Sequence, residues 1–175
     1  MFRNNRADFE LLMEKVTEAL IAYFKMQIAA GVDAVQFFDS WGGILKGKDY
    51  EEGSLKWMSK IIHAIRDDIP VILFAKGCTD EMPALCETGA QIIGLDWTVD
   101  IGTMAEAIPP HIAIQGNLDP MILNDSPETT RIETQKVLDA MKDRPGHIFN
   151  LGHGIDKGAK LDCVQALLDT IRNSS

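Results

Sequence analysis

The sequence predicts an α/β fold in which a parallel sheet is covered by helices on its faces. Five short apolar segments alternate along the chain with longer segments of helical periodicity. These apolar segments are continuous, which is typical of strands buried on both faces of a parallel sheet. The stretches AGVDAVQFFD and TGAQIIGLDW also share the order glycine, polar residue, apolar strand and aspartate. No linker or charge block divides the chain, so we expect a single domain over residues 1–175.

The helices are indicated by their apolar periodicity and by their end signals. The first is expected over residues 7–30, with one apolar stripe and with Gly31 just beyond its end. Ser126 and Pro127 mark the start of another helix, as its N-cap and first residue. Further helices are expected over residues 50–66, 80–87, 101–107 and 159–172. The stripe of the first helix is Phe9, Leu12, Met13, Val16, Leu20, Tyr23 and Phe24, and the inner face of the second is Leu55, Met58, Ile61, Ile62 and Ile65.

The strands are expected over residues 34–38, 71–74, 92–96, 112–115 and 147–151. Two architectures accommodate five such strands: a flavodoxin-like doubly wound sheet and a slice of a (β/α)8 barrel. A complete barrel typically needs about 250 residues, so the length of 175 residues favours the flavodoxin-like sheet. Periodicity does not separate the two.

Composition narrows the classes of function. The net charge of −9 disfavours non-specific nucleic-acid binding, which depends on neutralising phosphates with Lys and Arg. No apolar segment approaches the roughly 18 residues that a membrane helix needs, and the N-terminus lacks the apolar region of a signal peptide. The three cysteines have no metal-ligand spacing, and their odd number argues against a disulfide framework. We therefore expect a reduced, cytoplasmic protein.

The chemistry is concentrated where the strands end. The five strands lead into FDSWGG, FAKGC, LDWTVD, QGNLDP and NLGHGI, which are all polar or rich in glycine. Ligands of parallel α/β proteins bind at this carboxyl edge, so the five segments predict one shared pocket. The motifs GxGxxG, GxxxxGK[ST] and GxSxG are absent from the sequence, so dinucleotide, P-loop and α/β-hydrolase functions have no support.

Each candidate residue in these segments also has a purely structural interpretation. Asp39 and Asp96 are the type of residue that caps a turn, and Ser40 is a common turn residue. Trp41 and Trp97 are expected to be packing residues. Lys76 fits either a solvated turn or a carboxylate partner. His153 stands between two glycines, which offer it little packing, so a functional role and a structural one remain open.

The strand-end segments resemble a known family as a set. FDSWGGIL, PVILFAKG, GLDWTVDI, IAIQGNLDPMIL and GHIFNLGHGI are similar, in order and spacing, to the C-terminal half of uroporphyrinogen decarboxylases. The similarity runs from about Ala7 to the last helix, and QGNLDP and FNLGHGI are its most specific motifs. It implies a partial (β/α)8 TIM barrel that carries about the last five βα units, and so replaces the flavodoxin-like option.

The resemblance implies a carboxy-lyase of haem and porphyrin biosynthesis that uses no cofactor and no metal. Such an enzyme removes the carboxyl groups of the four acetate side chains of uroporphyrinogen III and leaves coproporphyrinogen III. The pyrrole is the electron sink: a ring carbon is protonated, CO₂ leaves, and the exocyclic carbon is reprotonated. Ser40 matches the family's substrate-contacting hydroxyl. His153 matches the histidine that reaches substrate carboxylates, where an imidazole can bind an anion or move a proton.

The sequence departs from the family in ways that bear on activity. The family's Arg-rich segment, its catalytic Asp and a substrate-contacting Tyr belong to the N-terminal half, so no catalytic residue is assigned here and Asp39 is not a substitute. After Ile155 the usual Pro-containing loop is replaced by DKGAKLDC. A half-barrel has open strand edges and this chain is acidic, so we expect poor binding of the polyanionic substrate by the chain alone. We expect it to pair with a complementing N-terminal half or to form a homo-oligomer.

Two alternatives to the decarboxylase are considered. A cobalamin- or coenzyme-M-linked methyltransferase of the same superfamily would need thiolate zinc ligands. The chain has Phe74-Ala75-Lys76 and His153 at the matching places, which disfavours that class. The other alternative is a non-catalytic remnant or partner half-barrel. If the chain instead belongs to an active decarboxylase, it is a truncated polypeptide or one part of a split enzyme.

Overall fold

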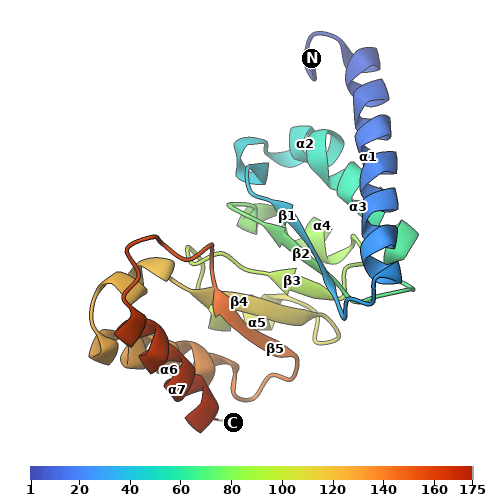
Figure 1. Ribbon diagram of the computed structural model, residues 1–175. Coiled ribbons are helices and arrows are strands. Elements are labelled where there is room, and N and C mark those ends of the chain that lie inside the picture. The colour runs from blue at the N-terminus through green and yellow to red at the C-terminus, as the bar shows by residue number, and fades with distance from the viewer. Residues whose placement is uncertain (175) are drawn as a thin grey trace. The chain divides into compact units, whose positions relative to one another are not determined.

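A computed structural model describes residues 1–174 (Figure 1). The chain divides into two compact units, Met1–Ile93 and Gly94–Ser175, which are described separately. The strands follow the order β1-β2-β3-β4-β5 in a five-stranded sheet, which confirms the α/β prediction. The single domain over residues 1–175 stays a prediction. The strands are β1 (Val35–Asp39), β2 (Val71–Ala75), β3 (Ile92–Gly94), β4 (Ala113–Leu118) and β5 (His147–Leu151), and the helices are α1 (Arg6–Ala29), α2 (Gly47–Tyr50), α3 (Lys56–Ile65), α4 (Met82–Cys86), α5 (Ile101–Ala107), α6 (Pro127–Met141) and α7 (Leu161–Asn173).

In the first unit, β1 and β2 pair in parallel, with Val35 opposite Val71 and Asp39 opposite Ala75. All five residues of the predicted inner face are buried: Leu55 just before α3, and Met58, Ile61, Ile62 and Ile65 on it. This apolar face covers the strands and forms the core of the unit.

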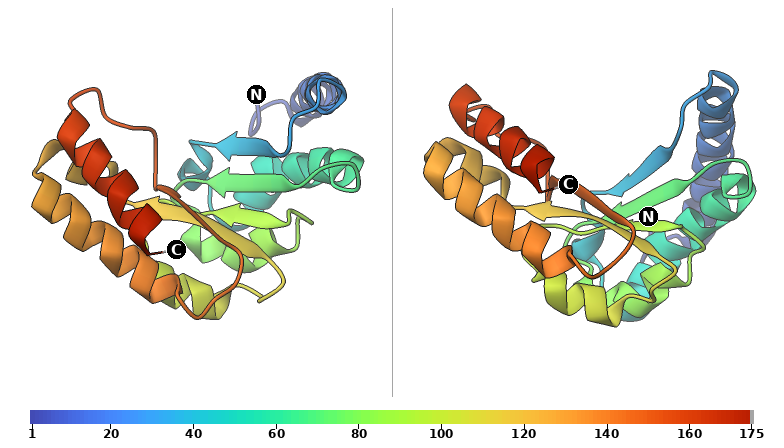
Figure 2. Two further views of the ribbon diagram at one scale, coloured as in Figure 1. Left: turned by 60° about the horizontal axis from the view of Figure 1, so that its bottom comes forward. Right: turned by 90° about the horizontal axis from the view of Figure 1, so that it is seen from below.

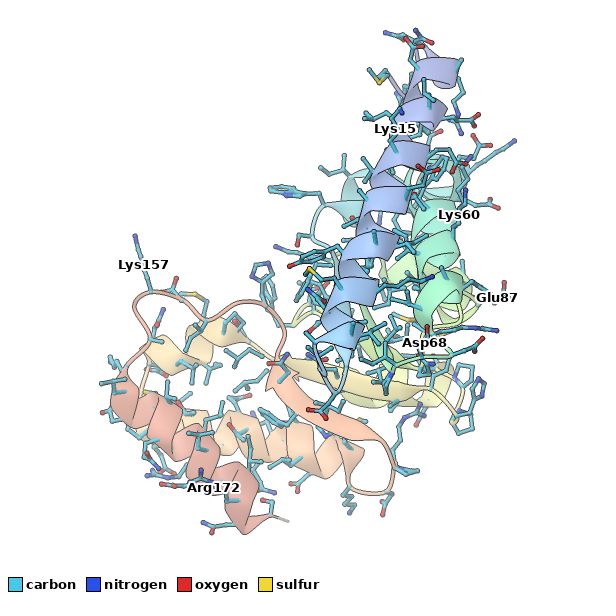
Figure 3. The ribbon with its side chains drawn as sticks, turned by 45° about the vertical axis from the view of Figure 1, so that its right-hand side comes forward. Lys15, Lys60, Asp68, Glu87, Lys157 and Arg172 are labelled. Carbon is cyan, nitrogen blue, oxygen red and sulfur yellow. The ribbon has the colours of Figure 1, made fainter. Side chains whose placement is uncertain are left out.

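Helix α1 is attached to α3 by a regular series of ion pairs. Its N-cap is Asn5, whose side chain accepts a hydrogen bond from the backbone N–H of Asp8. Glu10 pairs with Lys56 at 3.2 Å and Glu14 with Lys60, which is labelled on α3 in Figure 3. Gly31, which follows the C-terminal end of α1, has φ of +88°, as expected for the residue that ends a helix.

The apolar stripe of α1 is buried only in part. Phe24 is buried, whereas Leu12, Val16 and Tyr23 are exposed. Sequence periodicity shows that these side chains are apolar, but burial also requires a neighbouring element to cover them.

The helix expected over residues 50–66 is divided into three segments. Helix α2 ends at Tyr50, a π-helical turn spans Glu51–Leu55, and α3 begins at Lys56. The indole N–H of Trp57 donates a hydrogen bond to the Glu52 carbonyl at 3.1 Å. A side-chain hydrogen bond therefore adds to the backbone hydrogen bonds of the π-helical turn.

In the second unit, β4 and β5 pair in parallel and helices α6 and α7 pack side by side (orange and red in Figure 2). Ser126 caps α6 by accepting a hydrogen bond from the Thr129 N–H, and Pro127 is the first helical residue, as predicted. β4 is longer than expected and ends at Leu118, whereas β3 ends early at Gly94.

β5 has an exposure pattern that differs from the expected buried strand. Its residues alternate between half-buried and exposed, and Ile148 is 43% exposed. β1 also carries an exposed aromatic residue, Phe38, which is 63% exposed. These two strands are the ends of the strand order, where we expected open edges. Among residues 1–174, no helix is long and apolar enough to span a bilayer.

Candidate active-site residues

Ser40 lies immediately after β1, before a 3₁₀ turn over Gly42–Ile44. Its side chain is exposed. The hydroxyl can therefore donate a hydrogen bond to a bound ligand or accept one from it.

Asp39 fixes the backbone that carries Ser40. Its carboxylate accepts a hydrogen bond from the Ser54 hydroxyl at 2.7 Å, and its carbonyl accepts one from the Lys76 N–H at 3.1 Å. Sequence reasoning expected Asp39 to cap the turn that follows it. Instead, its carboxylate joins the end of β1 to the π-helical turn before α3.

Two glycines allow the loop after β1 to pack against the loop after β2. A Cβ atom at Gly42 would lie 2.5 Å from the Asp39 carboxylate and 2.9 Å from the Cys78 sulfur. A Cβ atom at Gly43 would lie 2.9 Å from the Gly77 carbonyl oxygen. Neither position accommodates a side chain without movement of its neighbours, so the glycines of FDSWGG are required for packing.

Tyr50 and Cys78 are buried beneath this loop. Burial raises the pKa of the Tyr50 hydroxyl far above its usual value, and the neighbouring Cys78 thiol and Asp39 carboxylate act in the same direction. Burial also raises the pKa of the Cys78 thiol. Both groups therefore stay neutral near pH 7, and they support the loop as packing residues.

Trp41 is 78% exposed, so the expectation that it is a packing residue is wrong. The next residue, Gly42, is buried against Asp39 and Cys78. Because the backbone of Gly42 occupies the inner side of the loop, the Trp41 side chain is left on the outside. Lys76 is half-buried, and its backbone bonds to both Asp39 and Gly43.

In the second unit, His153 follows β5 and is exposed. Its ring packs edge to face with Trp97, with 5.7 Å between ring centroids and 80° between ring planes. Gly152 is buried, and its N–H donates to the Leu118 carbonyl at 2.7 Å. A Cβ atom at Gly152 would lie 2.3 Å from the backbone nitrogen of Trp97. Trp97 therefore packs as predicted, and it does so by holding the segment that presents His153.

Asn117 connects the segment after β3 to the end of β4. Its side-chain N–H₂ group donates to the carbonyls of Asp96 at 2.9 Å and Val99 at 2.8 Å, and the residue is buried. Asp96 accepts hydrogen bonds from the backbone and the hydroxyl of Thr98, which confirms the turn-capping interpretation. Sequence reasoning gave Asn117 no role, although an amide at the end of an apolar strand was the available signal.

The loop DKGAKLDC after His153 is held by Asp156. Its carboxylate accepts hydrogen bonds from the Gly158 N–H at 2.8 Å and from the Asn124 side chain at 3.0 Å. The Gly158 N–H, followed by the Asn124 amide, lowers the pKa of Asp156. A charged Asp156 thus orders this loop.

The remaining histidines have other positions. His63 and His111 are exposed, as predicted, and the His147 ring is 2.9 Å from the Gly116 carbonyl oxygen.

Within residues 1–174, no group of three or more His, Cys, Asp or Glu side chains is placed to hold a metal ion. Ser40 belongs to the first unit and His153 to the second, and each is presented at the C-terminal end of a strand.

A cavity of about 660 Å³ in the first unit is formed by α2, α3 and α4. Its lining includes Glu51, Glu81 and Glu87 together with Lys48 and Lys56. Ser40 is not among its lining residues, so this cavity is separate from the candidate site.

Comparisons with known proteins agree with the strand-end motifs. The sequence model described as uroporphyrinogen decarboxylase (URO-D) matches residues 1–174. A uroporphyrinogen decarboxylase of Geobacter metallireducens is 43% identical over 148 residues, which are 84% of this chain and 44% of the relative. That of Magnetococcus marinus is 40% identical over 168 residues, which are 93% of this chain and 47% of the relative. The chain therefore spans about half the length of the curated relatives it matches.

A solved structure gives independent support for the fold. A methyltransferase from Methanosarcina mazei superposes with a TM-score of 0.77 at 18% identity, over 90% of this chain and 47% of that one. At this identity the likeness concerns the fold alone. Together with the match to residues 1–174, it confirms the prediction of a partial barrel. The chain belongs to the uroporphyrinogen decarboxylase family and corresponds to its C-terminal half.

Proposed function

We propose that this chain supplies one half of the active site of a uroporphyrinogen decarboxylase, with Ser40 and His153 as its substrate-contacting residues. The observation that carries the proposal is the presentation of His153, an exposed imidazole at a strand end whose segment is held by Gly152 and Trp97. The reaction is the cofactor-independent decarboxylation of the four acetate side chains of uroporphyrinogen III to methyl groups, which gives coproporphyrinogen III.

The two residues suit different parts of that reaction. The His153 imidazole can pair with a propionate or acetate carboxylate when protonated, and can pass a proton when neutral. The Ser40 hydroxyl can hold a substrate group in position by hydrogen bonding. The group that stabilises the cationic pyrrole would come from the complementing half. The net charge of −9 supports this division, because the polyanionic substrate needs additional cationic groups.

The proposed partner is a complementing N-terminal half that completes the barrel. Three observations support it: the relatives are about twice as long, β1 and β5 are end strands, and Phe38 and Ile148 expose apolar surface on them. A homo-oligomer that covers the same edges is the competing assembly. The proposed compartment is the cytoplasm, which is supported by the buried free thiols of Cys78 and Cys163.

The experiment is a reconstitution of activity. The chain is mixed with the half of the Geobacter metallireducens relative that it does not match, and conversion of uroporphyrinogen III is followed by chromatography of the oxidised porphyrins. We expect turnover by the mixture and negligible turnover by either part. His153→Ala should lower kcat/KM by about 10²-fold, the lower range for a proton-transfer group. Ser40→Ala should lower it about 10-fold, as for the loss of one hydrogen bond.

The matched control is His111→Ala, which removes an exposed histidine that precedes β4 rather than following a strand. It should leave kcat/KM within twofold of the unsubstituted mixture. The proposal fails if the chain alone turns over at the rate of a full-length enzyme, or if His153→Ala behaves like the control.

A further inference from the structure

We propose that Lys76 binds a carboxylate of the substrate next to Ser40, and this inference rests on the proposed function. The polyanionic substrate needs cationic partners, whereas the chain has a net charge of −9. Between β1 and α2 the one lysine or arginine is Lys46, and between β2 and the 3₁₀ turn at Thr79 it is Lys76. These two lysines are the cationic candidates at this edge of the first unit.

Lys46 stabilises the protein's own loops. Its ammonium donates a hydrogen bond to the Gly77 carbonyl at 2.9 Å and lies 3.8 Å from the Asp80 carboxylate. It therefore connects the loop after β1 to the segment after β2, and a substrate carboxylate would have to compete with Asp80 for it.

Lys76 occupies the position beside Ser40. β1 and β2 are paired with Asp39 opposite Ala75, so Ser40 and Lys76 are the next residues of the two chains. The Lys76 N–H donates to the Asp39 carbonyl at 3.1 Å, and the Lys76 carbonyl accepts from the Gly43 N–H at 3.1 Å. The backbone of Lys76 is thus bonded to the Ser40 loop both before and after Ser40.

Ser40 and Lys76 also continue the same face of the sheet. Successive side chains of a strand point to opposite faces, and paired residues of parallel strands share a face. Phe38 and Phe74 form such a pair, with 5.9 Å between their ring centroids. Ser40 and Lys76 each follow one of these rings by two residues, which is the period of a strand.

This face is opposite to the one that the helices cover. Phe37 points to the helical side, where its ring centroid is 5.7 Å from that of Phe24 on α1. Asp39 points to the same side, because its carboxylate bonds to the Ser54 hydroxyl before α3. Phe38, on the other face, is 63% exposed. A ligand at the strand ends therefore has access to the side of the sheet that Ser40 and Lys76 share.

The chemistry of the two side chains is complementary toward a carboxylate. An ammonium group has three donors and a full positive charge, and the Ser40 hydroxyl next to it can donate another hydrogen bond. Lys76 is half-buried, and a lysine in such a position packs its methylene stem while its charged end remains within reach of a ligand. The pair would hold one carboxylate arm at the edge of the pyrrole that reacts.

The experiment measures ligand binding separately from activity. The probe is uroporphyrin III, the oxidised fluorescent porphyrin that keeps the carboxylates of the substrate, and the chain is titrated into it. The test variant is Lys76→Met, which removes the charge and retains an unbranched stem. Lys76→Arg retains the charge and the donors. The matched control is Lys48→Met, the same substitution at a lysine on α2 whose side chain is 84% exposed and 3.7 Å from Glu52. Circular dichroism checks that each variant is folded.

We expect Lys76→Met to raise the Kd for uroporphyrin about 10-fold, as for the loss of a hydrogen bond to a charged group. Lys76→Arg should stay within about threefold of the unsubstituted chain, and Lys48→Met within twofold. In the reconstituted mixture, Lys76→Met should raise KM about 10-fold and change kcat much less, because the carboxylate is held equally before and during the reaction.

The inference is overturned if the unsubstituted chain does not bind uroporphyrin, or if Lys76→Met binds it like the control. It is also overturned if Lys76→Arg binds as weakly as Lys76→Met, because the charge would then not be the cause. Binding that depends on Lys76 without any decarboxylation by the mixture supports the carboxylate site and refutes the proposed function. Decarboxylation that is insensitive to Lys76→Met supports the proposed function and refutes the carboxylate site.

Discussion

Gly42 shows how a single residue holds the candidate site. It is buried where the Asp39 carboxylate and the Cys78 thiol meet beneath the Ser40 loop. Packing of this kind depends on the absence of a side chain, because an added methyl group would overlap both neighbours. The hydrogen bond between Ser54 and Asp39 lies at the same point, so a shift of the Asp39 carboxylate would also weaken that bond.

Gly42→Ala is therefore expected to reduce the free energy of unfolding by about 1–3 kcal/mol, the usual cost of overpacking. The measurement is denaturant unfolding followed by tryptophan fluorescence. Gly154→Ala is the control, because its added Cβ atom meets no atom within 4 Å. Equal stabilities of the two variants would show that the Gly42 contact is relaxed at no cost.

At the scale of elements, Arg144 stabilises the connection between α5 and β4 by hydrogen bonding. Its guanidinium donates to the carbonyls of Ala105, Ile108, Pro109 and Ile112, the last two at 3.1 and 2.9 Å. These carbonyls belong to the end of α5 and the turn after it. One planar side chain thus bonds to one carbonyl in the last turn of α5, that of Ala105, and to three carbonyls between α5 and β4.

Arg144→Lys is expected to lower the free energy of unfolding by about 1.5–3 kcal/mol, because an ammonium group cannot reach all four carbonyls. Thermal or denaturant unfolding measures the change. Arg131→Ala is the control: Arg131 forms an exposed ion pair with Glu128 on α6, and its loss should change stability by about 0.5 kcal/mol or less. A stability loss for Arg131→Ala as large as for Arg144→Lys would contradict the special role of Arg144.

Helix α5 provides a prediction about pH. Asp100 is its N-cap, and hydrogen bonds from the backbone and the hydroxyl of Thr103 lower the pKa of Asp100. Because the pKa of the folded state is below the unfolded value of about 3.9, this contribution is present above about pH 4. It is lost as the pH falls through the folded value.

Asp100→Asn separates the charge from the cap, because asparagine caps helices about as well as aspartate but does not titrate. The wild-type chain should be the more stable of the two at pH 7, and the difference in Tm should shrink as the pH falls from about 5 to about 3. Scanning calorimetry over this range checks the prediction. A Tm difference that is independent of pH would show that the charge contributes nothing.

At the scale of the whole molecule, stability is expected to depend on the proposed partner. A ligand that binds only the folded state stabilises it by mass action, by about 2.7 kcal/mol at 100 times its Kd. The unmatched half of the Geobacter metallireducens relative should therefore raise the Tm of this chain by about 5–10 °C at that concentration. Differential scanning calorimetry with increasing partner tests this, with an unrelated protein of similar charge as control. A Tm that does not change with partner concentration would argue against a complementing half.

The sequence by itself determined the order of strands and helices, the Ser126 cap of α6, the inner face of α3 and the family. These depend on local signals: apolar runs, side-chain capping and motifs at strand ends, all of which are written in consecutive residues. Only the tertiary structure decided that Trp41 points outward, that Asp39 bonds to Ser54, that the helix over residues 50–66 is divided, and that Asn117 joins two strand ends. It also showed that Leu12, Val16 and Tyr23 on α1 are exposed. The physical reason is the same in each case. Apolar periodicity tells which side chains gain from burial, but which atoms cover them depends on segments that are distant in sequence.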